Sequence, residues 1–322
     1  MKIVFMGTPD FAVPCLDALV NNGYDIVGVV TQPDKPSGRK QSCLKPPPVK
    51  EAAIKYGIRT ILQPTKVRTP EFLADIKGLE PDLIVTAAYG RILTREILDV
   101  PPLGCINVHG SLLPKYRGAA PIQWALINGD KVTGITTMFM DEGMDTGDIL
   151  LQRELAITEN MNSQELFDEL KELGAATLLE TLHELENGTL KRIPQDHTKA
   201  VHVPIMKKEM GLIDWNKSAI EIHNLVRGTY PWPGAYTFHE GNRIKIWKTT
   251  VLDSCPVGSP ETGLKEMAKE SQPGKVLKIF KENMIVATGD GCLRINELQF
   301  ENCRRMGICE CGHNMDEGEV LG

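Results

Sequence analysis

The feature that most constrains the fold is an alternation of short apolar runs with amphipathic segments along the first third of the chain. The run 2–6 ends at Gly7, and the segment 11–20 that follows places its apolar side chains on one helical face. The runs are too apolar to leave one strand face in water, which is typical of parallel sheets covered by helices on both faces. We therefore predict an α/β fold with a Rossmann-like, mainly parallel sheet, which would bind ligands at the carboxyl ends of its strands.

The same periodicity predicts the individual elements of this first domain. The predicted strands are 2–6, 24–31, 59–62, 83–87, 105–109 and 134–140, and the predicted helices are 11–20, 49–56, 71–79 and 163–185. Asn162 and Glu165 have the spacing of a capping pair for the last helix.

After Gly188 the pattern changes to short β-like runs separated by glycine-rich turns, at 243–248, 274–280, 284–288 and 292–298. Runs of this kind predict a small β-barrel, similar to an OB-fold. The expected organisation is an α/β domain over 1–189, a linker over 190–206 and a C-terminal β-barrel over 207–322.

Composition limits the classes of function. A chain of 322 residues, 42% of them hydrophobic, can bury the cores of two domains. The apolar run before Gly7 is too short for a signal peptide or a membrane span, so a cytoplasmic protein is expected. Most of the eight cysteines are scattered singly, which favours reduced thiols.

A net charge of -6 leaves only a local basic patch for any RNA contact. That patch, within 33–50, consists of Lys35, Arg39, Lys40, Lys45 and Lys50.

Two polar side chains meet at the end of one predicted strand. The two-residue period of a strand places Asn107 and His109 on one face, together with Cys105. The loop 110–118 that follows is apolar and contains glycine and proline, which suits the wall of a pocket for a flat heteroaromatic ligand. By contrast, the turn 7–11 lacks the second and third glycines of a dinucleotide fingerprint, which argues against NAD.

An acidic, glycine-rich loop, 140–148, leaves the neighbouring predicted strand and carries Asp145. An amide donor, an imidazole and a carboxylate are the groups needed to transfer an acyl group to an amine. Asn107 can bind the oxyanion, His109 can move protons, and Asp145 can orient the imidazole and stabilise its charged form. A structural histidine and a solvated turn are the simpler interpretation of these residues. Within enzymes, Cys105 is an alternative as an acyl-accepting nucleophile.

The motif Asn107-x-His109-x-Ser111-Leu112-Leu113-Pro114, with Asp145 downstream, resembles the active-site signature of the folate-dependent formyltransferases. The resemblance covers the whole chain. It extends to segments 7–12, 31–36, 117–122, 230–235 and 287–291. The basic loop and the C-terminal domain resemble the members that act on initiator methionyl-tRNA.

The resemblance implies that 10-formyltetrahydrofolate donates a formyl group to the amino group of methionine on initiator methionyl-tRNA, without a metal ion. The implied catalytic residues are Asn107, His109 and Asp145. The implied folate-binding residues are Ser111, Leu112, Leu113, Pro114, Tyr89 and Gly90. The implied tRNA-binding residues are Arg39, Lys40, Lys45, Lys207, Lys208, Arg243, Lys245 and Lys248. A monomer is expected.

Several alternatives remain open at this point. The family usually carries a lysine-rich glycine stretch near the C-terminus, whereas this chain has Cys303, Cys309, Cys311 and His313. These four residues are either zinc ligands or reduced thiols beside a histidine, and their irregular spacing favours the latter. Trp215, Trp232 and Trp247 are either packing anchors or stacking platforms for bases. The acceptor is either the tRNA or a small amine such as glycinamide ribonucleotide or an amino sugar. A non-catalytic tRNA-binding protein is the alternative outside enzymes.

Overall fold

The computed structural model describes residues 1–37, 43–252 and 263–322, which form two compact units. Unit 1 comprises Met1–Pro121, Val132–Ala156 and Phe167–Pro204. Unit 2 comprises Ile122–Lys131, Ile157–Leu166 and Ile205–Gly322. Two short internal segments thus pack with the C-terminal part of the chain, a division that the linear pattern of apolar residues does not reveal.

Unit 1 is built on a seven-stranded sheet with the strand order β10, β9, β7, β6, β1, β2, β5. The strands from β7 to β5 run parallel, whereas β9 runs antiparallel to both of its neighbours. The strands are β1 Lys2–Gly7, β2 Asp25–Val30, β5 Ile61–Leu62, β6 Leu83–Ala87, β7 Cys105–His109, β9 Val132–Phe139 and β10 Ile149–Ala156. The carboxyl ends of β1, β6 and β7 lie at one edge of the sheet, where the site is found.

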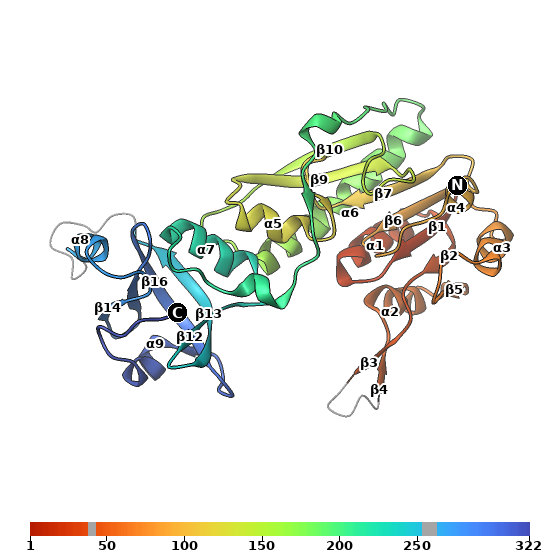
Figure 1. The fold of residues 1–322 in the computed structure, drawn as a ribbon. Coiled ribbons are helices and arrows are strands. Elements are labelled where there is room, and N and C mark those ends of the chain that lie inside the picture. Colours follow the sequence, from red (N-terminus) through yellow and green to blue (C-terminus); the bar gives the residue numbers. More distant parts are fainter. Residues whose placement is uncertain (38–42, 253–262) are drawn as a thin grey trace. The chain divides into compact units, whose positions relative to one another are not determined.

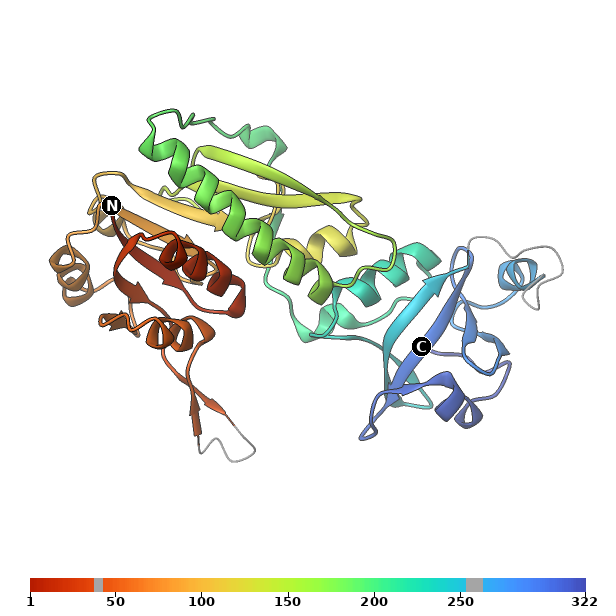
Figure 2. The ribbon, with the colours of Figure 1, turned by 180° about the vertical axis from the view of Figure 1, so that it is seen from behind.

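Helices cover both faces of this sheet. A Cβ added at Gly174 of α6 would lie 3.2 Å from Val108 of β7, so α6 packs directly on one face (Figure 2). On the other face, Phe72 of α3 and Ile97 of α4 join the apolar cluster that contains Cys105. The helices of this unit are α1 Val13–Asn21, α2 Pro48–Lys55, α3 Pro70–Gly78, α4 Arg95–Leu98 and α6 Ser163–Glu186, which begins in unit 2. The predicted fold class is confirmed (Figure 1).

The predicted capping pair of α6 is confirmed. The Asn162 side chain accepts hydrogen bonds from the backbone N–H groups of Gln164 and Glu165, at 2.9 and 3.1 Å. In return, the Glu165 carboxylate accepts from the Asn162 N–H at 2.9 Å. The pair satisfies N–H groups that would otherwise lack partners at the start of the helix.

Residues 190–204, which we call the strap, make ladder contacts with unit 1 although the sequence predicts a linker there. Ile193 bridges Ile149 at the start of β10. Strand β11 (His202–Val203) pairs in parallel with β8 (Arg117–Gly118). These pairings, and a hairpin formed by β3 (Lys35–Ser37) and β4 (Cys43–Lys45), are missing from the sequence-based prediction because such short strands carry no periodic signal.

Unit 2 contains an antiparallel sheet with the strand order β12, β13, β16, β15, β14. The bounds are β12 Ala235–His239, β13 Asn242–Val251, β14 Val276–Ile279, β15 Met284–Ala287, β16 Cys292–Phe300 and β17 Met306–Gly307, which pairs with β16. The helices are α5 Pro121–Ile127, which begins in unit 1, α7 Ala219–Gly228, α8 Leu264–Lys269 and α9 Ile308–Cys311. Ile222 and Val226 of α7 lie in the same buried cluster as Ile244 and Ile246 of β13.

The C-terminal segment connects the two outer strands of this sheet. Toward β14, the Leu321 N–H donates to the Gly274 carbonyl at 2.9 Å, and the Glu319 carbonyl accepts from the Val276 N–H at 2.8 Å. Toward β12, the Gly322 N–H donates to the Phe238 carbonyl at 3.0 Å. These bonds give unit 2 the character of the predicted barrel. Within the described residues, no helix has the length and apolarity needed to cross a membrane.

Candidate active site

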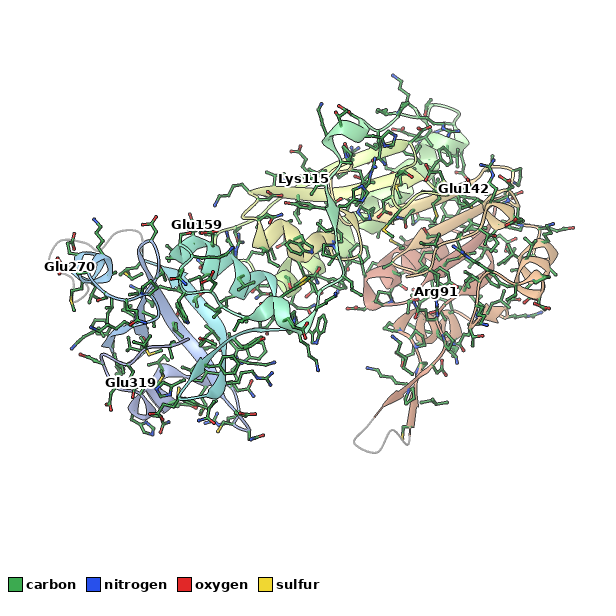
Figure 3. The ribbon with its side chains drawn as sticks, in the orientation of Figure 1. Arg91, Lys115, Glu142, Glu159, Glu270 and Glu319 are labelled. Atoms are coloured by element: carbon green, nitrogen blue, oxygen red, sulfur yellow. The ribbon has the colours of Figure 1, made fainter. Side chains whose placement is uncertain are left out.

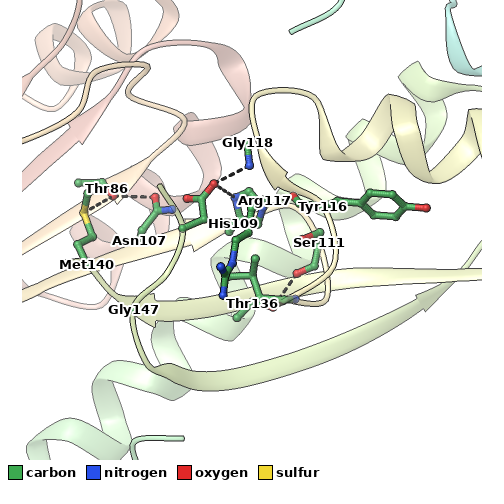
Figure 4. Close-up of polar contacts among 12 residues, drawn as sticks. Thr86, Asn107, His109, Ser111, Tyr116, Arg117, Gly118, Thr136, Met140 and Gly147 are labelled. Atoms are coloured by element: carbon green, nitrogen blue, oxygen red, sulfur yellow. Dashed lines mark hydrogen bonds and ion pairs between the residues drawn. The ribbon is translucent and has the colours of Figure 1, made fainter. Parts of the chain in front are cut away.

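Asn107 is half-buried on β7, and a hydrogen bond fixes the orientation of its amide (Figure 4). The Thr86 hydroxyl of the neighbouring strand β6 donates to the Asn107 Oδ1 at 2.7 Å. This bond leaves the Nδ2 group as a donor, and it has no acceptor among the described residues. A threonine in the otherwise apolar run 83–87 is the sequence signal that could have identified this support.

His109, at the end of β7, is held through one ring nitrogen. Its Nε2 lies 3.0 Å from the backbone carbonyl of Tyr116, and the side chain is 7% exposed. A carbonyl can only accept, so Nε2 carries a proton and Nδ1 is the nitrogen that can take up another one. Nδ1 faces Asp145 Oδ2 at 3.8 Å, a distance at which a carboxylate stabilises an imidazolium.

Asp145 reaches the histidine by an indirect route. Strand β9 runs antiparallel to β7, with Ile106 opposite Phe139, so the loop after β9 starts at the edge away from His109. The loop folds back over the sheet, and Asp145 adopts a left-handed conformation with φ of 56°. Its Oδ2 accepts from the Gly118 N–H at 2.8 Å. The structure therefore brings the three predicted catalytic residues together. Asp145 reaches the other two through the folding back of its loop, because β9 and β7 are antiparallel and do not end at the same edge of the sheet.

The loop after His109 contains both buried and partly exposed side chains among the residues predicted to bind folate. Ser111 is fully buried, and its hydroxyl donates to the Lys115 carbonyl at 2.7 Å. Leu113 packs in an apolar cluster with Met138 and Ile149. Leu112 and Pro114 are partly exposed and can line a ligand site with their side chains. Lys115, on this loop, and Glu142, on the loop after β9, are labelled in Figure 3.

Thr136 and Gln152 brace the loop from the sheet. The Thr136 hydroxyl donates to the Ser111 carbonyl at 2.6 Å and accepts from the Leu113 N–H at 3.1 Å. Gln152 Nε2 donates to the Leu113 carbonyl at 2.9 Å. The loop is thus fixed by side chains of β9 and β10 before any ligand binds.

Tyr89 and Gly90 follow β6 at the same edge of the sheet. Burial raises the pKa of the Tyr89 phenol to about 12, so its side chain belongs to the core. Its backbone carbonyl accepts from Thr8 Oγ1 and Gln32 Nε2, each at 3.1 Å. Gly90 is exposed with φ of +78°, so this segment can offer a ligand its backbone rather than the Tyr89 ring.

Cys105 does not have the properties of a nucleophile. Burial, and the neighbouring Asp99, raise the pKa of its thiol to about 12. The Sγ donates to the Leu98 carbonyl at 3.7 Å and lies within the apolar cluster under α4. A thiolate is the reactive form of cysteine, and it does not form here near neutral pH.

The basic loop of the sequence analysis corresponds to the hairpin β3–β4 (Figure 1). Lys45 is exposed on β4, whereas Arg39 and Lys40 lie outside the described residues. Lys50 contributes little free charge, because its ammonium group lies 2.8 Å from an oxygen of Asp34.

In unit 2, the outward face of β13 combines basic and aromatic side chains. The Arg243 guanidinium lies 5.7 Å from the ring centre of Tyr236, and the Lys245 ammonium lies 5.0 Å from that of Trp247. Arg305, which sequence reasoning missed, lies 5.6 Å from the Trp247 ring centre. The fold brings these groups together from separate segments of the chain. In the sequence, the pair of adjacent arginines at 304 and 305 is the signal that could have indicated a role for Arg305.

The other predicted contacts of unit 2 are more scattered. Lys207 and Lys208 are exposed at the start of a short 3-10 helix, and Lys248 is exposed beyond a bulge in β13. Trp215 is a packing anchor, with its Nε1 donating to the Thr237 hydroxyl at 2.9 Å. Trp232 is 52% exposed.

The cysteine-rich segment near the C-terminus forms no metal centre in the described part of the chain. No group of three or more His, Cys, Asp and Glu side chains there is arranged to hold a metal ion. Cys303 and Cys309 are exposed, whereas Cys311 is buried with its Sγ 3.2 Å from the Gly307 carbonyl. The described cysteines are free thiols.

Comparison with known proteins shows the class of protein to which this chain belongs. The family described as formyl transferase matches residues 1–182, and the family described as formyl transferase, C-terminal domain, matches residues 205–313. HypX from Aquifex aeolicus in complex with tetrahydrofolic acid aligns with a TM-score of 0.62 and 17% identity, over 96% of this chain and 46% of HypX. The N-formyltransferase from Helicobacter canadensis, in complex with folinic acid and dTDP-3-aminofucose, aligns with a TM-score of 0.65 and 18% identity, over 92% of this chain and 99% of that one. These solved structures share the fold, and the class is that of the formyl transferases.

Sequence identity then shows to which family of formyl transferases the chain belongs. The methionyl-tRNA formyltransferase of Acetivibrio thermocellus is 55% identical over the full length of both chains. The chain belongs to the methionyl-tRNA formyltransferase family, and it is a formyl-transferring enzyme.

Proposed function

We propose that the protein transfers a formyl group from 10-formyltetrahydrofolate to the amino group of methionine on initiator methionyl-tRNA, for translation initiation in the cytoplasm. The observation that carries the proposal is the contact of His109 with Asp145 beside Asn107, within a chain 55% identical to a methionyl-tRNA formyltransferase. The tetrahydrofolic acid bound to HypX supports the choice of donor. The chemistry needs no metal ion.

The three side chains take complementary roles in the proposed reaction. The amino nitrogen attacks the formyl carbon, and the carbonyl oxygen becomes an oxyanion that the free Nδ2 of Asn107 stabilises. His109 Nδ1 takes the proton that the attacking nitrogen loses, while Asp145 stabilises the imidazolium. The bond from the formyl carbon to folate N10 breaks, and the same proton moves from His109 to N10. The products are formylmethionyl-tRNA and tetrahydrofolate.

We assign folate binding to the edge of the sheet beside these residues. Leu112 and Pro114 supply apolar contacts, and the backbone of the loops that carry Ser111, Leu113, Tyr89 and Gly90 supplies donors and acceptors. A planar pterin fits such a site because its edge carries several hydrogen-bonding atoms and its faces are apolar.

We assign tRNA binding to two regions and expect the protein to act as a monomer. The basic segment within 33–50, which carries Arg39, Lys40 and Lys45, engages the acceptor end, and Lys207, Lys208, Arg243, Lys245 and Lys248 contact phosphates. Basic and acidic residues are nearly equal in number over 206–322, so binding there depends on the one-sided basic and aromatic face of β13. In this assignment residues 1–189 carry catalysis and one tRNA-binding region, 190–206 lead from the first domain to the second, and 207–322 carry the other tRNA-binding region.

The test is formyl transfer from 10-formyltetrahydrofolate to methionyl-tRNA, with glycinamide ribonucleotide as a parallel acceptor. We expect kcat to fall by roughly 10²–10³-fold for Asn107→Ala, because one oxyanion donor is lost. For His109→Ala we expect a loss of about 10²–10⁴-fold, because the proton carrier is lost. Asp145→Ala should reduce kcat in the same direction.

Matched controls replace the same residue types at exposed positions of unit 1. Asn187→Ala, His183→Ala and Asp75→Ala should keep wild-type rates. Formylation of the small amine alone would contradict the proposed acceptor. Absence of both activities would favour a non-catalytic tRNA-binding protein.

A further inference from the structure

We propose that Gln195 is a positioning residue for the loop that carries Asp145, an inference that rests on the proposed function. Gln195 is 6% exposed, whereas its neighbours over 191–194 and 196–199 are all exposed. A polar side chain is buried at a cost unless hydrogen bonds replace those it made with water. A single buried glutamine in an exposed segment therefore indicates specific partners.

Every hydrogen-bonding position of the Gln195 amide is used. Its Oε1 accepts from Nε and Nη2 of Arg117, at 3.1 and 2.6 Å. Its Nε2 donates to the carbonyls of Asp145 and Gly147, at 3.0 and 2.7 Å. A glutamine amide accepts two hydrogen bonds and donates two, so the set is complete. If the amide were reversed, its NH2 group would face the Arg117 N–H groups and its oxygen would face the two carbonyls. The hydrogen bonds therefore determine the orientation of the Gln195 amide.

The nitrogen of Gln195 acts on the backbone from which the catalytic carboxylate projects. Asp145 has φ of 56°, a conformation that side-chain-bearing residues rarely adopt without support. Hydrogen bonds to its own carbonyl and to that of Gly147, two residues later, hold this turn from one side. The Asp145 carboxylate is thereby directed at the Gly118 N–H and at His109.

The oxygen of Gln195 acts on the opposite partner of the same contact. Arg117 is 3% exposed and precedes Gly118, the residue whose N–H binds Asp145. Strand β11 of the strap pairs with Arg117 and Gly118, and a Cβ at Gly118 would lie 2.4 Å from the Val203 carbonyl. The strap thus holds both the donor and the acceptor of the Gly118–Asp145 hydrogen bond.

The informative substitution is Gln195→Glu. It keeps an acceptor for the Arg117 guanidinium, so the fold should be retained, but it places an oxygen against the carbonyls of Asp145 and Gly147. We expect kcat for formyl transfer to fall about 100-fold, the loss typical of a reacting group displaced by about 1 Å. KM for both substrates and the melting temperature should stay near wild type. Thr198→Ala is the matched control, because Thr198 is an exposed residue of the strap whose hydroxyl donates to Asp196 of the same segment.

A double-mutant cycle distinguishes positioning from a general structural effect. If Gln195 acts through Asp145, then Gln195→Glu combined with Asp145→Asn will be no slower than Asp145→Asn alone. Losses that multiply in the double variant would overturn the proposal. A loss confined to KM in Gln195→Glu would also overturn it.

Hydrogen exchange provides a readout that does not depend on activity. Peptides covering 141–148 should exchange faster in Gln195→Glu than in Thr198→Ala, because the loop has lost two of its hydrogen bonds. Unchanged exchange would overturn the role of Gln195. An inactive wild-type protein would overturn the proposed function instead, and the exchange result would still test the role of Gln195.

Discussion

Asn107 and His109 both depend on partners that lie outside the sequence signature. Thr86 supplies the hydroxyl that turns the amide nitrogen of Asn107 outward, and the Tyr116 carbonyl selects the ring nitrogen of His109 that can take up a proton. These two contacts determine which atom of Asn107 can donate and which ring nitrogen of His109 can accept a proton. A signature that names only Asn107 and His109 leaves the direction of each hydrogen bond undetermined.

Cys105 provides a test of the mechanism at the residue scale. Because burial raises the pKa of its thiol to about 12, Cys105→Ala should leave kcat unchanged within experimental error. Stability should fall by about 1 kcal/mol, the usual loss for a small change in the core. Steady-state rates and chemical unfolding measure the two quantities. A loss of activity by orders of magnitude, with the fold intact, would support covalent catalysis by the thiol.

The hairpin β3–β4 is anchored at its base by a cluster of side chains. Lys50 Nζ donates to both oxygens of Asp34, at 2.9 and 2.8 Å, and to Gln63 Oε1 at 2.7 Å. Gln63 Nε2 in turn donates to Asp34 at 2.7 Å. The cluster connects the segment between β2 and the hairpin with α2 and with the residue that follows β5, so it fixes the point where the hairpin leaves the sheet.

This cluster predicts a dependence of stability on pH. Hydrogen bonds from Gln63 and Lys50 lower the pKa of the Asp34 carboxyl below its ordinary value of 3.8. A lowered folded-state pKa stabilises the protein at pH values above the unfolded-state pKa, and the contribution disappears as pH falls through the folded-state pKa. Wild type should therefore be more stable than Asp34→Asn at pH 7, and the difference should vanish in strong acid.

Denaturant unfolding of both proteins between pH 7 and pH 2 measures this difference. Lys77→Gln, at an exposed position of α3, serves as a charge control whose effect on stability should not follow the same pH profile. A difference between wild type and Asp34→Asn that stays constant across the range would contradict the assignment.

At the scale of the whole molecule, each unit is completed by a short segment that pairs with strands far from it in sequence. The strap follows α6 within unit 1, pairs with β8 and supplies Gln195. Residues 318–322 return to the sheet of unit 2 and connect β14 with β12. Both segments are short, and both form backbone hydrogen bonds with other parts of their unit.

The C-terminal segment offers a matched pair of substitutions. Leu321 is 2% exposed and lies in the core of unit 2, whereas its neighbour Val320 is 39% exposed. Leu321→Ala should destabilise the protein by about 2–5 kcal/mol, because it leaves a cavity in the core. Val320→Ala should cost no more than about 1 kcal/mol. Equal effects in denaturant unfolding would mean that residue burial in this segment does not stabilise the barrel.

Much of the fold is readable from the sequence because periodicity is a local property. The boundaries of β6 and β7 agree with the predicted runs 83–87 and 105–109, and the helix 163–185 differs from α6 by one residue. Helix α7 is absent from the prediction, although Ser218 and Glu221 form a capping box at its start. That local signal was present and is easily overlooked beside the β-rich pattern around it.

The fold class, the family resemblance and the three residues proposed for catalysis can all be predicted from the amino-acid sequence, since residue type and spacing carry that information. The route by which Asp145 reaches His109 is visible only in the folded chain, because the direction of β9 and the folding back of the loop after it leave no local sequence pattern. The burial of Cys105 and the contacts of the strap are likewise visible only in the folded chain. Burial and hydrogen-bond partners arise from segments far apart in the chain, and so they appear only when the chain is folded.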